Sequence, residues 1–264
     1  MNRDDSSAYE SSTDPRCVPI RLDGQAPEGA AIPYPDYPTA DHATWSKLYA
    51  RQRARLSGRA CREFLEGLEA MGFPEDRIPS LSSSSRVLEA AAGWKVARVP
   101  GLLHEEQFFA FLARRVFPST DYIRPPEEMD YTPAPDLFHD VFAHLPMITH
   151  PGFADFYQNM GRCALAARGA DRRRIERFYW FTVEFGMIET SEGIRVYGNG
   201  ILSSYAEIEH ALGAHVVKLP FDPDRIAEQE YDVSHLQPVL FVIESFEQLT
   251  QGFEAWARKR GLGR

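Results

Sequence analysis

The stretch Thr132–His144, TPAPDLFHDVFAH, decides how the rest of the 264-residue chain is interpreted. It places His139 and His144 in a mainly apolar run, directly behind a loop that two prolines stiffen. A helix that is apolar on every side is a buried helix, and imidazole is the commonest metal-binding side chain. The stretch therefore predicts a buried helix that carries part of a metal site.

The carboxylate that would complete this site lies in Phe178–Ile188, FYWFTVEFGMI, where Glu184 is the only formal charge. A lone buried carboxylate is unfavourable unless it is paired, hydrogen-bonded or bound to a metal. Two imidazole nitrogens and one carboxylate, with coordination positions left open, are the ligand set of non-haem Fe(II) oxygenases. We therefore expect His139, His144 and Glu184 to be the catalytic metal ligands.

The spacing of the two histidines leaves other interpretations open. Residues five apart lie roughly 140° apart on a straight α-helix, so both reach one metal only if one sits near the helix end. Zinc peptidases place their histidines at i and i+4 instead. A zinc hydrolase with the same three ligands and Asp140 as general base remains a rival. From the H-x4-H pattern alone, two hydrogen-bonded histidines without a metal carry equal weight.

Three motifs in order resemble the catalytic domain of the pterin-dependent aromatic amino acid hydroxylases, most closely the short bacterial phenylalanine 4-hydroxylases. They are the stretch at 132–144, the run Tyr179–Gly186 and the run Tyr197–Ser204. The similarity extends from about Asp41 to Phe246. It implies a mainly α fold with a few short β-strands and a single catalytic domain around a central iron site, which we place at residues 39–264.

The resemblance also implies the reaction and its cofactors. These are the hydroxylation of L-phenylalanine to L-tyrosine by O2, with Fe(II) and a reduced tetrahydropterin such as tetrahydrobiopterin. The pterin contacts implied by the motifs are Gly101, Leu102, Leu103, Phe108, Asp140 and Tyr179. The implied contacts of the amino acid substrate are Arg124, Thr132, Pro135, Trp180, Gly200 and Ser203. For Asp140 a helix-surface acid is an equally weighted interpretation, and a surface arginine without a role is the alternative for Arg124.

Two positions favour phenylalanine as the substrate. Trp180 matches the tryptophan of phenylalanine and tyrosine hydroxylases, and Val233 matches a valine of the phenylalanine enzymes that is acidic in the tyrosine enzymes. Action on tryptophan, or at the 3-position of phenylalanine, is the alternative within the family. A non-catalytic amino-acid-binding homologue is the alternative outside it. Two residues depart from the family pattern: Ala143 replaces a glycine and Ala134 a glutamate.

Composition limits the partners and the compartment. The net charge of −9 gives no electrostatic reason to expect nucleic acid or an anionic membrane as a partner. Three widely spaced cysteines suggest no disulfide framework, so we expect a reducing cytoplasm. We expect a monomer whose partners are its amino acid substrate and, indirectly, the enzymes that recycle the pterin. Residues 1–38, rich in Ser, Asp, Pro and Gly, are expected to form a disordered or extended lead-in.

Periodicity predicts local structure around these motifs. Apolar stripes predict helices from Asp41 and around Cys61–Met71, and the Ser-rich run Ser80–Ser85 is expected to be a loop. The run Arg172–Arg174 is expected to be the solvated start of the Glu184 helix, and Glu207–His210 a surface helix.

Overall fold

Helices α1 (Thr39–Leu56) and α2 (Arg62–Met71) form on the two predicted apolar stripes. The structure is a computed structural model, and it describes residues 14–233 and 235–263. Helix α1 buries Trp45, Leu48 and Tyr49 in the main core. Helix α2 ends at Gly72, whose φ of 57° is the left-handed conformation that glycine adopts without strain. Both predicted helices are confirmed.

Helix α3 (Leu81–Ala92) contradicts the prediction of a Ser-rich loop. Ser80 is its N-cap, because the Ser80 hydroxyl accepts a hydrogen bond from the backbone N–H of Ser83. Leu81 and Leu88 lie on its buried face. Serine therefore acts here as the start signal of a helix, and the apolar spacing after it decides the structure.

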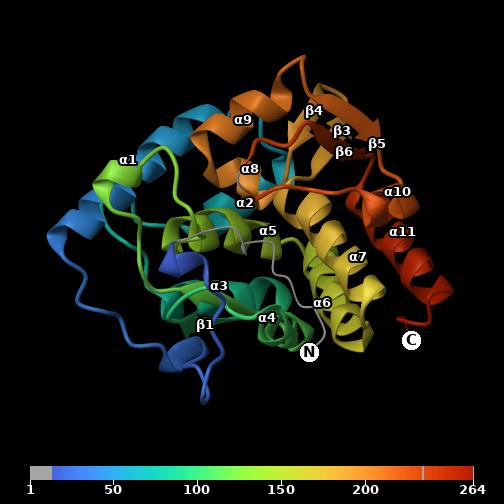
Figure 1. The fold of residues 1–264 in the computed structure, drawn as a ribbon. Coiled ribbons are helices and arrows are strands. Elements are labelled where there is room, and N and C mark those ends of the chain that lie inside the picture. Colours follow the sequence, from blue (N-terminus) through green and yellow to red (C-terminus); the bar gives the residue numbers. More distant parts are fainter. Residues whose placement is uncertain (1–13, 234, 264) are drawn as a thin grey trace.

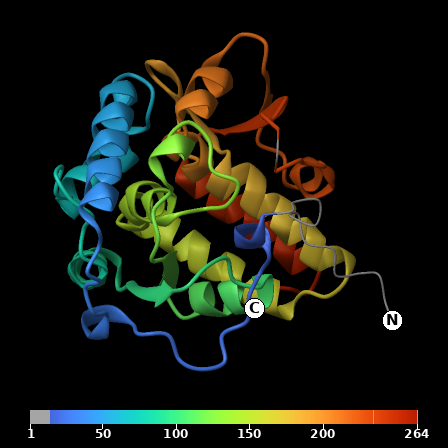
Figure 2. The same cartoon turned by 60° about the vertical axis from the view of Figure 1, so that its left-hand side comes forward.

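The remaining helices build most of the molecule. Helix α4 packs on α6, which also contacts α7 and α11, and Figures 1 and 2 show α6, α7 and α11 side by side. The bounds of these and the other helices are α4 Glu105–Ala113, α5 Leu145–Ile148, α6 Pro151–Ala166, α7 Ala170–Phe178, α8 Asn199–Ser203, α9 Tyr205–Leu212, α10 Pro223–Glu228 and α11 Phe246–Lys259.

Two small sheets complete the fold. Strands β1 (Lys95–Val99) and β2 (Val116–Thr120) pair in parallel, with Lys95 opposite Val116. A four-stranded sheet has the order β4-β3-β6-β5. Its strands are β3 Met187–Thr190, β4 Gly193–Val196, β5 Val217–Pro220 and β6 Val239–Ile243. The predicted class, mainly α with a few short strands, is confirmed.

The described part of the lead-in, residues 14–38, is fastened to the rest of the protein. Arg16 donates two hydrogen bonds to the Glu128 carboxylate, each 2.8 Å long, and the Cys17 thiol donates to the carbonyl of Pro133 at 3.0 Å. Single β-bridges join Ile20 to Leu103 and Glu28 to Ala97. Residues 1–13 lie outside the described residues, so the expected disorder there stays a prediction. Within the described ranges, no helix is long and apolar enough to cross a bilayer.

Candidate active site

A wide helical turn brings the two histidines of the central stretch together. The helix that begins at Leu137 is π-helical over the segment η4, His139–His144, and returns to the α form in α5. In a π-helix each residue hydrogen-bonds five positions along the chain, so residues i and i+5 lie above one another. The Nε2 atoms of His139 and His144 are 3.0 Å apart. The five-residue spacing therefore suits a π-helical turn, whereas a straight α-helix would hold the two imidazoles apart.

Glu184 completes a cluster with these histidines. Its Oε1 lies 3.3 Å from His144 Nε2, and its Oε2 lies 3.6 Å from His139 Nε2. One ligand atom from each of the three residues lies within 4.8 Å of the other two, a spacing that fits a shared metal ion. Glu184 is the last residue of a second π-helical segment, η5 (Tyr179–Glu184), which continues α7.

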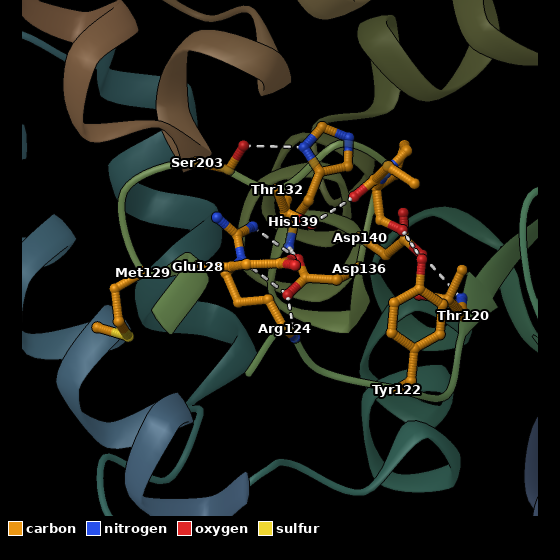
Figure 3. Close-up of polar contacts among 12 residues, drawn as sticks. Thr120, Tyr122, Arg124, Glu128, Met129, Thr132, Asp136, His139, Asp140 and Ser203 are labelled. Carbon is orange, nitrogen blue, oxygen red and sulfur yellow. Dashed lines mark hydrogen bonds and ion pairs between the residues drawn. The ribbon is translucent and has the colours of Figure 1, made fainter. Parts of the chain in front are cut away.

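The other ring nitrogens of the histidines are held from outside the cluster, and Figure 3 shows the contact between His139 and Ser203. His139 Nδ1 lies 2.8 Å from the Ser203 hydroxyl, and His144 Nδ1 lies 2.9 Å from the side-chain amide of Asn199. The Asn199 Oδ1 atom is buried and has no hydrogen-bond partner within the described residues. Half a turn of that amide would bring this oxygen to the Nδ1–H of His144, leaving Nε2 as a free lone pair for a metal.

The protonation states also suit metal binding. Burial lowers the pKa of His139 to about 4, because a charged imidazole is disfavoured away from water. Burial opposes the ionisation of Glu184 as well, but His144 and His139 beside it hold its pKa at about 2. Neutral imidazole and ionised carboxylate are the forms in which these groups bind metals.

A close backbone approach explains the glycine of the third motif. A Cβ atom added at Gly198 would lie 2.4 Å from the carbonyl oxygen of Glu184. No side chain fits at that distance without a shift of the backbone. The chain after β4 can therefore pass directly against the end of η5, which places α8, with Asn199 and Ser203, beside the histidines.

One cavity of about 480 Å³ joins these elements. It is lined by every residue predicted to bind metal, pterin or substrate, namely His139, His144, Glu184, Gly101, Leu102, Leu103, Phe108, Asp140, Tyr179, Arg124, Thr132, Pro135, Trp180, Gly200 and Ser203. The metal cluster thus faces both predicted pockets. The placement agrees with the sequence prediction, whereas the individual roles of these residues stay predictions.

Arg124 is buried and not a surface arginine. Its Nε and Nη2 donate hydrogen bonds of 2.8 and 2.7 Å to the Asp136 carboxylate, which also accepts from the backbone N–H of His139 (Figure 3). This pairing keeps the pKa of Asp136 below its usual value despite complete burial. The sequence analysis missed Asp136, although its position three residues before His139 is a capping signal.

Asp140 is also buried, so the interpretation as a helix-surface acid is wrong. Its Oδ2 accepts hydrogen bonds from the backbone N–H and the hydroxyl of Thr120, at 2.7 and 2.9 Å. Burial nevertheless raises its pKa to about 7. The carboxylate ties the end of β2 to the metal-binding helix while it lines the cavity.

Two expectations about charged surface residues are only partly correct. Arg173 is the exposed residue that the basic run predicts, although it also lines the cavity with Arg172, whereas Arg174 is half-buried and ion-paired with Asp171 and Glu228. Glu207 lies in the first turn of a helix, as expected, but it lines the cavity instead of belonging only to the surface. Tyr231, which lines the cavity and stacks on Trp180 at 4.5 Å between ring centroids, was missed altogether. Helical and loop patterns do not report which polar residue faces a cavity.

Comparison with known proteins agrees with this geometry. The family model for biopterin-dependent aromatic amino acid hydroxylases matches residues 21–262. The chain is 43% identical to a phenylalanine-4-hydroxylase of Pseudomonas aeruginosa, over 81% of this chain and 82% of that protein. It is also 37% identical to the tyrosine 3-monooxygenase of Rattus norvegicus, over 89% of this chain and 48% of that protein.

Solved structures are similar over the same region. Phenylalanine hydroxylase from Chromobacterium violaceum, with bound iron(III) and 7,8-dihydrobiopterin, superposes with a TM-score of 0.82 at 43% identity, covering 85% of this chain and 83% of that one. The cold-active phenylalanine hydroxylase of Colwellia psychrerythraea also reaches 0.82, at 35% identity, covering 87% of this chain and 92% of that one. With its metal cluster, cavity and sequence in agreement, this chain belongs to the biopterin-dependent aromatic amino acid hydroxylases.

Proposed function

We propose that the protein hydroxylates L-phenylalanine to L-tyrosine, using O2 and a tetrahydropterin at an iron(II) centre. The observation that carries this proposal is the convergence of His139, His144 and Glu184 in the cavity that the predicted pterin and substrate residues also line. Bacterial relatives with phenylalanine hydroxylase names cover four fifths of the chain. When bound, iron and the reduced pterin would activate O2, and the pterin would supply the electrons that the reaction needs.

The residues of this chain bind and orient the iron, the substrate and the pterin, and they exclude water from the site. In the proposed arrangement His139, His144 and Glu184 hold the iron. Arg124 and Thr132 bind the carboxylate and amino groups of the substrate, while Pro135, Trp180, Gly200 and Ser203 surround the rest of it. The pterin is placed against Gly101–Leu103, Phe108 and Tyr179, with Asp140 at its edge. Phe108 and Tyr179 already lie edge to face, with centroids 5.5 Å apart, and so form one apolar corner for a flat ring.

The ring pocket supports phenylalanine over tyrosine. Trp180 and Tyr231 stack face to face, and Val233 also lines the cavity. A phenolic hydroxyl beside Val233 would lose its hydrogen bonds with water without gaining one from that side chain. An unsubstituted phenyl ring has no such penalty, so we assign phenylalanine as the preferred substrate.

Three accompanying proposals concern the whole protein. We assign the catalytic domain to residues 39–264, although the family match begins earlier, at residue 21, inside the lead-in. We propose a monomer that works in the cytoplasm, where the three buried free cysteines stay reduced. Its partners are then the amino acid, the pterin and, indirectly, the enzymes that regenerate the pterin.

A product assay tests the function. Metal-stripped protein is reconstituted with Fe(II) and a tetrahydropterin, given phenylalanine, tyrosine or tryptophan separately, and its products are separated by chromatography. We expect p-tyrosine from phenylalanine only when both iron and pterin are present. A product from tryptophan, or m-tyrosine from phenylalanine, would change the substrate assignment within the family. No product from iron-loaded protein would favour a binding protein instead.

A further inference from the structure

The acidic side chains of the cavity differ in whether they have a partner. Glu184 belongs to the metal cluster, Asp140 is bonded to Thr120, and Asp130 forms an ion pair with Arg51. Glu105 lies 3.4 Å from a ring nitrogen of His104. Throughout residues 14–233 and 235–263, nothing forms a hydrogen bond or an ion pair with the carboxyl group of Glu176 or of Glu207. These two acids are therefore available to a ligand.

The carboxyl group of Glu207 is not used by its own helix. Ser204 caps α9 by accepting a hydrogen bond from the backbone N–H of Glu207 at 3.3 Å. In a complete capping box the glutamate would bind the backbone N–H of the serine in return. Here the Ser204 N–H donates to the carbonyl of Ile201 instead. The cap fixes the backbone at Glu207 and leaves its carboxyl group in the cavity wall.

The position of Glu207 can be traced from the metal cluster. Ser203, which contacts His139, directly precedes Ser204, the cap of α9, and Glu207 lies in the first turn of that helix; both Ser203 and Glu207 line the cavity. On another side of His139, Asp136 holds Arg124, whose Nη1 makes no hydrogen bond within the described residues. The wall around His139 thus presents one guanidinium and one unpaired carboxyl group to the cavity. A zwitterionic amino acid head group has the complementary pair of charges.

We propose that Glu207 joins Thr132 in binding the α-ammonium group of the amino acid substrate, in the cavity that also holds the carboxylate site at Arg124. This inference rests on the proposed function and adds a specificity residue to it. Burial raises the pKa of Glu207 to about 7, and no cation in the described part of the chain forms an ion pair with it. The ammonium group of a bound amino acid supplies that missing cation. Glu207 therefore selects amino acids over carboxylic acids with the same ring.

Equilibrium binding to two matched ligands tests this role. Iron-loaded protein is titrated calorimetrically without O2, once with L-phenylalanine and once with 3-phenylpropionate, which has the same ring and carboxylate but no ammonium group. The wild-type protein should prefer phenylalanine by roughly tenfold or more, the usual size of a charge-assisted hydrogen bond. Glu207→Gln should lose most of that preference and keep its affinity for 3-phenylpropionate. Glu207→Asp should retain part of the preference.

Glu176→Gln is the matched control, because Glu176 lines the same cavity from α7 and its carboxyl group also has no partner among the residues that the structure describes. We expect it to keep the wild-type preference. An unchanged preference in Glu207→Gln would overturn the proposal, as would an equal loss of affinity for both ligands, which indicates a general distortion of α9. Because no turnover occurs in this experiment, failure of the hydroxylation assay and failure of the Glu207 assignment are separate results.

Discussion

The two π-helical segments that carry the metal cluster face different surroundings. Segment η4 is anchored in the core, where Phe138 and Phe142 stack at 4.8 Å and Trp45 packs edge-on against Phe138. Segment η5 instead exposes part of Tyr179 and Trp180 to the cavity. Close packing resists displacement, whereas a cavity wall can change with little effect on the core. The comparison predicts that changes in η4 act mainly on the metal site and that changes in η5 also act on ring binding.

The largest effect should come from removing a ligand, and it should be the same on either segment. His144→Ala and Glu184→Ala should each lose stoichiometric iron and reduce hydroxylation by more than about 100-fold, since even outer partners of ligands contribute 10- to 100-fold. Iron content after gel filtration and initial rates measure this. If a variant kept both its iron and its activity, the substituted residue would not be a metal ligand.

Breaking the support behind η4 should cost stability. Asp136→Ala leaves the Arg124 guanidinium buried without its counter-charge, and losing one member of a buried ion pair costs about 3–5 kcal/mol. Urea denaturation gives the change in the free energy of unfolding. The double variant Asp136→Ala/Arg124→Met should be less destabilised than Asp136→Ala alone. If the two are equally unstable, the cost comes from lost packing or capping and not from the unpaired charge.

A substitution in the cavity wall beside η5 should weaken the binding of the substrate ring without lowering the iron content. Tyr231→Leu removes the stacking partner of Trp180, and such aromatic pairs contribute about 0.5–1.5 kcal/mol. Loss of that energy should raise KM for phenylalanine roughly two- to tenfold, while the iron content stays normal. Loss of iron in this variant would contradict the comparison, because it would show that a change in the cavity wall also disturbs the metal site.

The smallest effect is expected inside η4. Ala143 is fully buried but does not line the cavity, so its methyl group does not narrow the site. Ala143→Gly should cost about 1 kcal/mol of stability, because glycine loses more backbone freedom on folding. Activity should be equal or higher, as measured by steady-state rate at saturating substrates. A large loss of rate would mean that the methyl group positions the histidines.

Much of the fold and the site could be predicted from sequence, and the failures have physical causes. The apolar stripes around Trp45 and Phe64 and the lone charge of Glu184 depend on local pattern, and those predictions agree with the structure. The π turns could not be predicted, because they add one residue to a helix without changing its apolar character. Helix α3 was missed because serine favours both caps and loops.

The pairing of strands and the burial of polar side chains were the other properties that could not be predicted, because they depend on residues distant in the sequence. Strand β2 forms because β1 lies beside it, a contact between segments separated by α4. The burial of Asp140 and Arg124 depends on Thr120 and Asp136, which meet them only in the folded chain. Glu207 resembled any acid at a helix start, since the sequence does not indicate that a cavity lies in front of it.

The lead-in contacts the cavity wall at two places. It contacts Pro133, beside the proposed substrate site, and Leu103, beside the proposed pterin site. A ligand that ordered both walls would also stabilise the attached lead-in, and by reciprocity the attached lead-in would then strengthen the binding of that ligand. The Arg16 ion pair with Glu128, which helps to fasten the lead-in, is the contact at which such a link would be tested without a change to the metal ligands.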